Sequence, residues 1–304
     1  MTKRKVKLKI KKKNFIIFLV IIFLLVFSLI KATNLVVNAL KTPKKKKNNI
    51  ETKEKNKKEE PVTDLDKVKK QIDYFNNDYL ERYQKYKDNN PDMDIIQIIK
   101  NVNMQLDNPH YDYKIPAKNK NTNKILVNKY YYLDEDYIPE NLEKISTTYA
   151  LSDMHMVKEA KEAFEEMAKA AKKEKLNIIA MSTYRSYEYQ VDLYNRYKKQ
   201  DGEEKADTYS GRPGHSEHQT GLAVDVYNGQ TNYTNFEKTK EFTWMNNHAH
   251  EYGFILRFPK DKEKETGYEY ESWHYRYVGK EIATYIKENN ISFEEYYATI
   301  IKDW

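Results

Sequence analysis

Two short stretches of the chain contain residue types that can bind a metal ion or transfer a proton. The first, SGRPGHSEHQTGLAVDV, contains His218 in a loop rich in glycine and proline and Asp225 in the apolar run LAVDV. The second, YEYESWHYRYV, places Glu271 three residues before His274 in an aromatic, strand-like run. Because a buried carboxylate without a partner is strongly unfavourable, we expect Asp225 to be neutralised by a metal ion or by a basic side chain.

These residues can form a metal site of the catalytic type. Cysteine is absent, so any metal ion must be held by histidine, aspartate or glutamate. His218, Asp225 and His274 would give two neutral imidazoles and one carboxylate, a three-ligand zinc set with an open fourth position. Glu271 is then the candidate base for a water that the metal activates. On spacing alone, the alternative is that Asp225 caps a turn or forms a salt bridge.

The elements that must position these residues predict an α+β fold. Helices and strands alternate, but the strands are few and short and lack the regular rhythm of a doubly wound sheet. We therefore expect a small, mostly antiparallel sheet flanked by helices. Apolar periodicity and turn residues predict strands near 125–133, 177–186, 221–227, 254–258 and 272–279, and helices near 156–176, 187–199 and 242–252 and after the last strand.

The N-terminal residues predict export. Residues 2–13 carry eight positive charges, and Phe15–Ile30 follows with sixteen residues and no charge. By the positive-inside rule the basic flank stays in the cytoplasm, so the rest of the chain is expected on the outer side of the membrane. We predict a basic cytoplasmic segment at 1–13 and a signal anchor or transmembrane helix at 14–40. The alternative is cleavage near Ala39, which would release a secreted protein.

The remaining sequence divides into a tether, a spacer and a main domain. Residues 41–63 have almost no apolar side chains and are predicted to be a disordered, charged linker. Residues 64–115 are predicted to form a helical spacer, with helices over about 68–87 and 92–106. The main domain is predicted at 120–304.

The charge distribution argues against nucleic-acid binding. The chain has a formal net charge of +7, but residues 1–63 hold 18 Lys and Arg against 4 Asp and Glu, and residues 64–304 hold 35 against 42. A nucleic-acid-binding surface would place basic side chains on the folded domain, whereas these lie beside the apolar N-terminal run. We expect no nucleic-acid partner, and the sequence predicts no protein partner.

Four strings of the main domain resemble successive signature blocks of a known family. They are STYRSYEYQVDLY, RPGHSEHQTGLAVDV, HEYGFILRFP and ESWHYRYVG, in that order. They are similar to the blocks of the VanY-type D-alanyl-D-alanine carboxypeptidases, zinc peptidases that act on peptidoglycan stem peptides. The resemblance runs from about Ile125 to Tyr285 and implies the zinc D-Ala-D-Ala carboxypeptidase fold.

The resemblance also implies roles for individual residues. In the SxHxxGxAxD block it makes His218 and Asp225 zinc ligands, and in the ExWH block it makes His274 the third ligand and Glu271 the catalytic base. The position after Glu271 is often proline in relatives and is Ser272 here.

Three further residues are expected to bind substrate: the resemblance implies this for Arg185 and Gln190, and Ser216 could add a neutral hydrogen bond. Arg185 and Gln190 match the YRSxxxQ block, and Ser216 opens the SxHxxGxAxD block. Arg185 carries a planar, permanent charge that suits a terminal carboxylate. For His215 we expect either a place behind a ligand or no role, and for Trp273 packing rather than substrate stacking.

The sequence therefore predicts a membrane-tethered, extracytoplasmic zinc metallocarboxypeptidase. Its expected cofactor is Zn²⁺, and its expected substrate is a peptidoglycan stem peptide from which the C-terminal D-alanine is removed. One alternative is an L,D-carboxypeptidase acting on tetrapeptide stems, because the zinc chemistry is the same. The other is a non-catalytic module that binds peptidoglycan.

Overall fold

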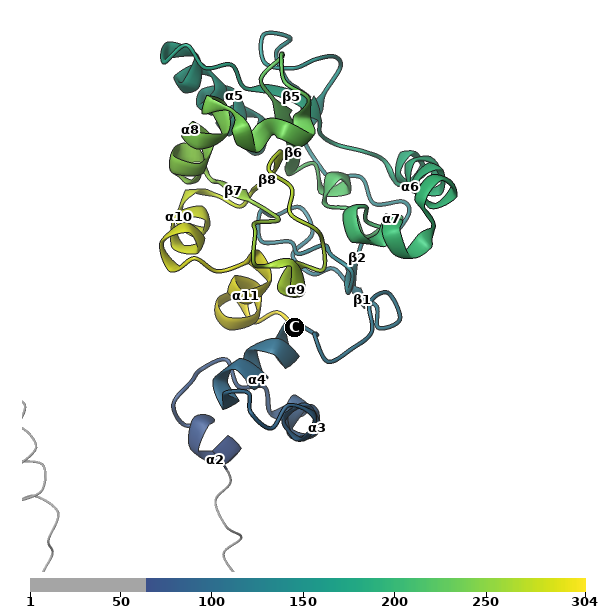
Figure 1. Ribbon diagram of the computed structural model, residues 1–304, viewed down its shortest axis with the longest axis vertical. Helices are drawn as coiled ribbons and strands as arrows, with labels where there is room; N and C mark the ends of the chain where they lie inside the picture. The colour runs from purple at the N-terminus through teal and green to yellow at the C-terminus, as the bar shows by residue number, and fades with distance from the viewer. Residues whose placement is uncertain (1–63) are drawn as a thin grey trace, which may run out of the picture. The chain divides into compact units, whose positions relative to one another are not determined.

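The computed structural model describes residues 64–304, which belong to one compact unit (Figure 1). The predicted basic segment, signal anchor and linker at 1–13, 14–40 and 41–63 lie outside the described residues. Among residues 64–304, no helix combines the length and the apolar character needed to cross a membrane.

A small helical layer with its own core opens the described chain. Its residues Leu65, Tyr83 and Ile99 are buried together. The predicted helix over 68–87 is wrong as a continuous element: the side chain of Asn76 accepts a hydrogen bond from the backbone of Asp78, and such local bonds compete with helix formation. The layer consists of α2 (Asp64–Val68), the 3₁₀-helix η1 (Asn77–Tyr79), α3 (Leu80–Asn89) and α4 (Ile95–Asn103).

The centre of the main domain is a four-stranded sheet in the order β5-β6-β8-β7. All three neighbouring pairs are antiparallel. Two further sheets have two strands each, so the predicted α+β class with a small, mostly antiparallel sheet is confirmed. The central strands are β5 (Ile179–Ser182), β6 (Ala223–Tyr227), β7 (Phe254–Leu256) and β8 (His274–Tyr277), and the outer ones are β1 (Ile115–Pro116), β2 (Tyr131–Tyr132), β3 (Leu142–Lys144) and β4 (His155–Val157).

Helices on both sides of the sheet complete the domain. In Figure 1, α8 and α10 lie on one side of the sheet and α6 and α7 on the other. The apolar face of α5 contributes Phe164 and Met167 to the main core, where they pack with Val224 and Val226 of β6. The helices are α5 (Lys158–Lys173), α6 (Tyr187–Asp201), α7 (Glu203–Tyr209), α8 (Lys240–His248), α9 (Glu263–Thr266), α10 (Lys280–Asn289) and α11 (Phe293–Tyr296), and the shorter turns include η2 (Glu217–Thr220), η3 (Tyr233–Lys238), η4 (Ala249–Tyr252) and the π-helical turn η5 (Tyr297–Ile301).

One predicted strand is mostly irregular. Of residues 125–133, only Tyr131 and Tyr132 form a strand. The run is buried almost throughout instead of alternating, because it packs into two cores: Ile125 and Val127 into the main core and Leu126 into the core around α10 and α11. Helix α7 was not predicted.

Candidate active site

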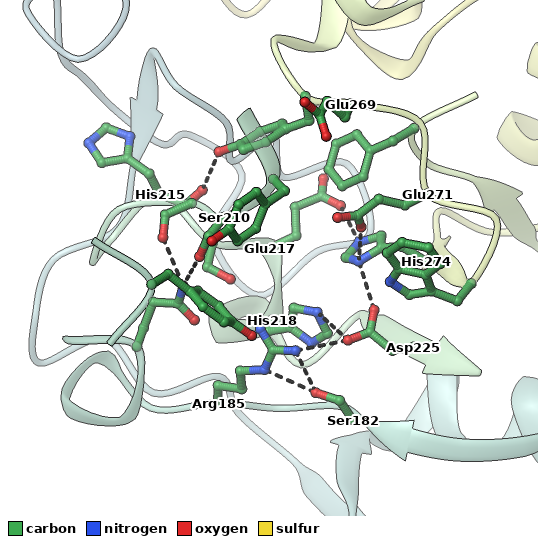
Figure 2. Close-up of a pocket in the computed structure, with 18 of the residues that line it drawn as sticks. Ser182, Arg185, Ser210, His215, Glu217, His218, Asp225, Glu269, Glu271 and His274 are labelled. Atoms are coloured by element: carbon green, nitrogen blue, oxygen red, sulfur yellow. Dashed lines mark hydrogen bonds and ion pairs between the residues drawn. The ribbon is translucent and has the colours of Figure 1, made fainter. Parts of the chain in front are cut away.

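A cavity of about 370 Å³ lies where β6 and β8 face the segments that precede α6 and follow α7. Figure 2 shows that charged and aromatic side chains from both parts of the chain point into it. The structure brings all seven predicted site residues to this one cavity: Arg185, Gln190, Ser216, His218, Asp225, Glu271 and His274.

Sheet register brings Asp225 and His274 together. These residues are direct partners in the antiparallel pair of β6 and β8, and Ser182 of β5 is the partner of Asp225 on the other side. Directly paired residues project from the same face of a sheet, so the three side chains form one row. Val224 and Val226 project from the opposite face into the core.

A tight turn brings His218 to the same row. His218 lies in η2, which ends at Gly221 with φ of +68°. A Cβ atom at Gly221 would lie 2.9 Å from Leu142 Cδ2 and 3.1 Å from Val157 Cγ2, so the left-handed turn and the packing both favour glycine. The turn leads directly into β6, which explains how two residues seven apart reach one site.

His218, Asp225 and His274 form a compact set of potential ligands. All three are buried, and one ligand atom from each lies within 4.8 Å of the others. His218 Nε2 is 3.3 Å from one carboxylate oxygen of Asp225, and His274 Nδ1 is 3.0 Å from the other.

The ring orientation of His218 is fixed by the backbone. Its Nδ1 lies 2.7 Å from the carbonyl oxygen of Thr183, so Nδ1–H donates to that oxygen and Nε2 is left to face Asp225. The backbone N–H of Arg185 also donates to the carbonyl of His218. The segment before α6 therefore holds this histidine through both its side chain and its main chain.

Electrostatics favour the charged forms of Asp225 and His274, whereas burial and Arg185 lower the pKa of His218. Burial alone would raise the pKa of the Asp225 carboxyl, but His218 and His274 hold that pKa well below its usual range. Burial alone would lower the pKa of His274, but the carboxylates of Asp225 and Glu217 raise it to about 9. A divalent cation would displace the proton that His274 holds, since metal ligation requires a neutral imidazole.

Glu271 lies beside this cluster with an altered acidity. One of its carboxylate oxygens is 3.6 Å from His274 Nδ1, and its backbone N–H donates to the carbonyl of Phe258. Burial raises the pKa of Glu271 to about 8, although His274 opposes the shift. A carboxyl group with a pKa near neutrality suits both uptake and release of a proton at physiological pH.

The predicted substrate residues are all present, with partners inside the protein. Arg185 donates to Asp225 at 2.8 Å and to Ser182 at 2.7 and 3.0 Å. The side-chain N–H of Gln190 donates to the carbonyl of Gly211 at 2.7 Å, whereas its side-chain oxygen is buried with no hydrogen-bond partner in the described part of the chain. Ser216 is buried in the cavity wall.

His215 and Trp273 have different surroundings. His215 Nδ1 lies 2.8 Å from the carbonyl oxygen of Asn128, and its ring meets Tyr111 edge-on. The ring is turned away from the potential ligands (Figure 2), so His215 packs and positions a loop. Trp273 lines the cavity and contacts Tyr233 edge-on at 5.0 Å.

Sequence reasoning missed a buried carboxylate behind the cluster. Glu217 precedes His218 and is paired with Arg257 and Arg276, two fully buried arginines. Burial alone would raise the pKa of Glu217, but the two guanidinium groups hold it below the usual range. A signal was available in the sequence, because both arginines interrupt apolar strand runs, FILRF and HYRYV, as Asp225 interrupts LAVDV.

Comparison with known proteins relates this chain to a family of carboxypeptidases. The family model described as VanY, D-alanyl-D-alanine carboxypeptidase, matches residues 153–280. The chain is 41% identical over 184 residues to the Putative carboxypeptidase YodJ of Bacillus subtilis (strain 168), covering 58% of this chain and 67% of that protein. It is 34% identical over 183 residues to a D-alanyl-D-alanine carboxypeptidase of Enterococcus faecium, covering 57% of each.

Solved structures agree. The LdcB LD-carboxypeptidase is similar with 41% identity and a TM-score of 0.54, covering 58% of this chain and 85% of that one. VanYB in complex with D-Alanine-D-Alanine is similar with 32% identity and a TM-score of 0.51, covering 59% and 98%. A variant of the vancomycin resistance D,D-pentapeptidase VanY in complex with Zn(II) is similar with 32% identity and a TM-score of 0.50, covering 57% of this chain and 98% of that one.

The α+β fold and the comparisons define the class of this protein as a peptidase. Within that class, the chain belongs to the VanY D-alanyl-D-alanine carboxypeptidase family, as the four sequence strings predicted.

Proposed function

We propose that this protein is a zinc metallocarboxypeptidase that removes the C-terminal D-alanine from peptidoglycan stem peptides. The observation that carries the proposal is the convergence of His218, Asp225 and His274 within 4.8 Å, with Glu271 beside them in the wall of a 370 Å³ cavity. The relatives named as D-alanyl-D-alanine carboxypeptidases support the reaction type.

The residues present fit a zinc ion. His218 presents Nε2 and His274 presents Nδ1 toward the Asp225 carboxylate, which gives the two-nitrogen, one-oxygen donor set of many catalytic zinc sites. The similar VanY structure with Zn(II) supports the same metal. When bound, zinc supplies Lewis acidity that polarises the scissile carbonyl and acidifies a water molecule.

Glu271 is the residue proposed to move the proton. As a carboxylate it accepts a proton from the attacking water, and as the acid it returns that proton to the nitrogen of the departing D-alanine. Its distance of 3.6 Å from His274 Nδ1 supports this role, because Glu271 then lies beside the proposed metal site and is not one of the three potential ligands. A non-catalytic wall-binding module has no need for a buried glutamate at this position.

Arg185 is proposed to bind the terminal carboxylate of the substrate. Its guanidinium group lies in the cavity wall and already pairs with one carboxylate, that of Asp225. Zinc ligation by Asp225 would weaken that pairing and leave N–H donors for the substrate. The free side-chain oxygen of Gln190 and the hydroxyl of Ser216 offer neutral hydrogen bonds to the same peptide.

L,D-carboxypeptidase activity is a second candidate function. The LdcB LD-carboxypeptidase, at 41% identity and a TM-score of 0.54, favours it. The two activities share the metal, the base and the leaving D-alanine, and differ in the residue on the other side of the bond.

We further propose that residues 14–40 anchor the protein so that the catalytic domain faces the cell wall, on the basis of the lysine-rich flank.

One experiment tests the reaction and separates the candidates. Metal content of the purified full-length chain is measured together with its turnover of a stem pentapeptide and a stem tetrapeptide. Zinc with release of D-alanine from the pentapeptide supports D,D-activity, and release from the tetrapeptide alone supports L,D-activity. Zinc-independent turnover would contradict the proposal, and so would binding of both peptides without cleavage.

A further inference from the structure

Two buried atoms behind the metal site face each other without partners. They are His274 Nε2 and Glu217 Oε2, which lie 3.6 Å apart. Neither atom has a hydrogen-bond partner among the described residues, although both are inaccessible to solvent. Buried polar atoms are nearly always satisfied, so an unpaired donor nitrogen beside an unpaired acceptor oxygen needs an explanation.

The rest of Glu217 is fully used. Its other oxygen, Oε1, accepts hydrogen bonds from Arg257 Nε at 2.8 Å and from Arg276 Nη1 at 2.9 Å. Hydrogen bonding to the two guanidinium groups therefore occupies one carboxylate oxygen of Glu217. The second oxygen is left free and is directed at the imidazole of His274.

The arginines hold Glu217 rigidly in place. Arg276 donates to the backbone carbonyls of Asn123 and Ile125, and Arg257 forms a two-point ion pair with Glu294 at 2.6 and 2.9 Å. Both arginine side chains are wholly buried, so the network has no freedom to reorient in solvent. The two ring nitrogens of His274 face different carboxylates: Nε2 lies 3.6 Å from Glu217 Oε2, whereas Nδ1 lies 3.0 Å from Asp225 Oδ1 and 3.6 Å from Glu271 Oε2.

We propose that Glu217 is a positioning residue for the metal site, accepting a hydrogen bond from His274 Nε2–H. This inference rests on the proposed function, because it takes Nδ1 of His274 as the metal-binding nitrogen. A proton held on Nε2 leaves Nδ1 with a free lone pair, and a carboxylate partner makes the imidazole a better ligand. The carbonyl oxygen of Thr183 has the same role for His218: it accepts a hydrogen bond from Nδ1–H and leaves Nε2 as the metal-binding nitrogen.

A purely structural role makes a different prediction for conservative variants. In Glu217→Gln the amide oxygen can still accept from Arg257 and Arg276, but the group facing His274 becomes an NH₂ donor. That donor favours the His274 tautomer with the proton on Nδ1, and this nitrogen then has no free lone pair for the metal. The matched control is Glu294→Gln, which removes one carboxylate from the same network without touching His274.

The test measures zinc affinity by chelator competition on the full-length chain, using variants confirmed as folded by circular dichroism. We expect Glu217→Gln to weaken zinc binding about 10- to 100-fold, the usual effect of losing the outer partner of a histidine ligand. Glu294→Gln should weaken it less than about tenfold. Equal losses in the two variants, or none in Glu217→Gln, would overturn the inference.

A second measurement needs no variant. In zinc-loaded wild-type protein with ¹⁵N-labelled histidine, nuclear magnetic resonance should show His274 protonated on Nε2 and His218 protonated on Nδ1. A proton on His274 Nδ1 would overturn the inference. Failure of the wild-type protein to bind zinc would instead overturn the proposed function, so the two failures are distinguishable.

Discussion

The cavity wall formed by β6 and β8 differs from the wall formed by residues 182–190 and 209–216 in how its polar groups are satisfied. On the sheet wall, Asp225 and His274 are placed by strand register, and Glu217 behind them is neutralised by two buried arginines. On the other wall, Arg185 shares its guanidinium between Ser182 and Asp225, and the side-chain oxygen of Gln190 has no partner in the described chain.

This contrast suggests that the sheet wall carries out the hydrolysis and that the facing wall binds the substrate peptide. On the sheet wall, one potential ligand atom from each of His218, Asp225 and His274 lies within 4.8 Å of the others, so this wall can hold a cation. The facing wall keeps donors and acceptors that a peptide can use. Changes on the sheet wall should therefore abolish turnover, whereas changes on the facing wall should weaken recognition of particular substrate groups.

Removal of the metal should have the largest effect. The chain contains no cysteine, and the serines that line the cavity, Ser182, Ser210 and Ser216, have no hydrogen bond to a histidine or carboxylate among the described residues that could activate them. Hydrolysis is therefore expected to depend on a metal-activated water. Dialysis against a chelator should abolish D-alanine release, and added zinc should restore it. Turnover that persists in protein shown to be free of metal would contradict a catalytic role for a metal ion bound by His218, Asp225 and His274.

Glu271→Gln should have the next largest effect. The substitution keeps the size of the side chain but removes the base, and it leaves the three potential ligands intact. We expect kcat to fall by about 10²- to 10⁴-fold, the usual contribution of a positioned acid and base. Zinc content, measured by elemental analysis, should stay near that of the wild type. A wild-type rate in this variant would show that another group accepts the proton.

The raised pKa of Glu271 also predicts how metal-free protein responds to pH. Its pKa is about 8 in the folded chain against an ordinary value of 4.5, so folding favours the neutral carboxyl. The associated stability is present below about pH 4.5 and is lost as pH rises through 8.

Metal-free wild-type protein should therefore lose stability between pH 5 and 8.5 more steeply than metal-free Glu271→Gln, by a few kcal/mol at most. Urea unfolding at a series of pH values measures both slopes. His274, whose pKa is also raised, contributes a decline to both proteins, and a larger one to the wild type because the Glu271 carboxylate helps to raise that pKa. Parallel slopes would mean that Glu271 is not desolvated in solution.

The sheet wall was also the more predictable of the two from sequence. Asp225 inside LAVDV and the spacing of Glu271 and His274 pointed to a possible metal set with a base beside it, because a charge inside an apolar strand requires a partner, and the family resemblance implied the role of each residue. The structure brings these residues together, and their roles remain a prediction. Which residues pair across strands depends on register, which no single strand specifies. The same reasoning applied to Arg257 and Arg276 would have pointed to buried acids, but not to Glu217 and Glu294 as those acids.

The irregular parts of the fold were less predictable. Residues 125–133 contain β-prone residues, but they pack into two cores at once, so tertiary burial replaced the expected alternation. The break between Val68 and Leu80 includes a local hydrogen bond in which the Asn76 side chain accepts from the backbone of Asp78, a contact that apolar periodicity does not reveal. The α+β class was predictable because the helices around the sheet have strong apolar faces, as in α5.

The smallest expected effect lies on the facing wall and concerns Arg185. If its guanidinium pairs with the terminal carboxylate of the substrate, Arg185→Ala and amidation of that carboxylate each delete the same charge-assisted hydrogen bond. Each change should cost about 1.5 to 3 kcal/mol in kcat/KM. Because both remove one interaction, the two losses should not add when they are combined.

Measuring kcat/KM for wild type and Arg185→Ala on free-acid and amidated stem peptides closes this cycle. Arg185 also donates to Asp225, so its removal has a second route to lower activity through the sheet wall. Zinc affinity separates the routes: an unchanged affinity with non-additive losses assigns Arg185 to the substrate. Reduced zinc affinity with fully additive losses would show that Arg185 acts by supporting Asp225. Another residue of the facing wall would then bind the terminal carboxylate of the substrate.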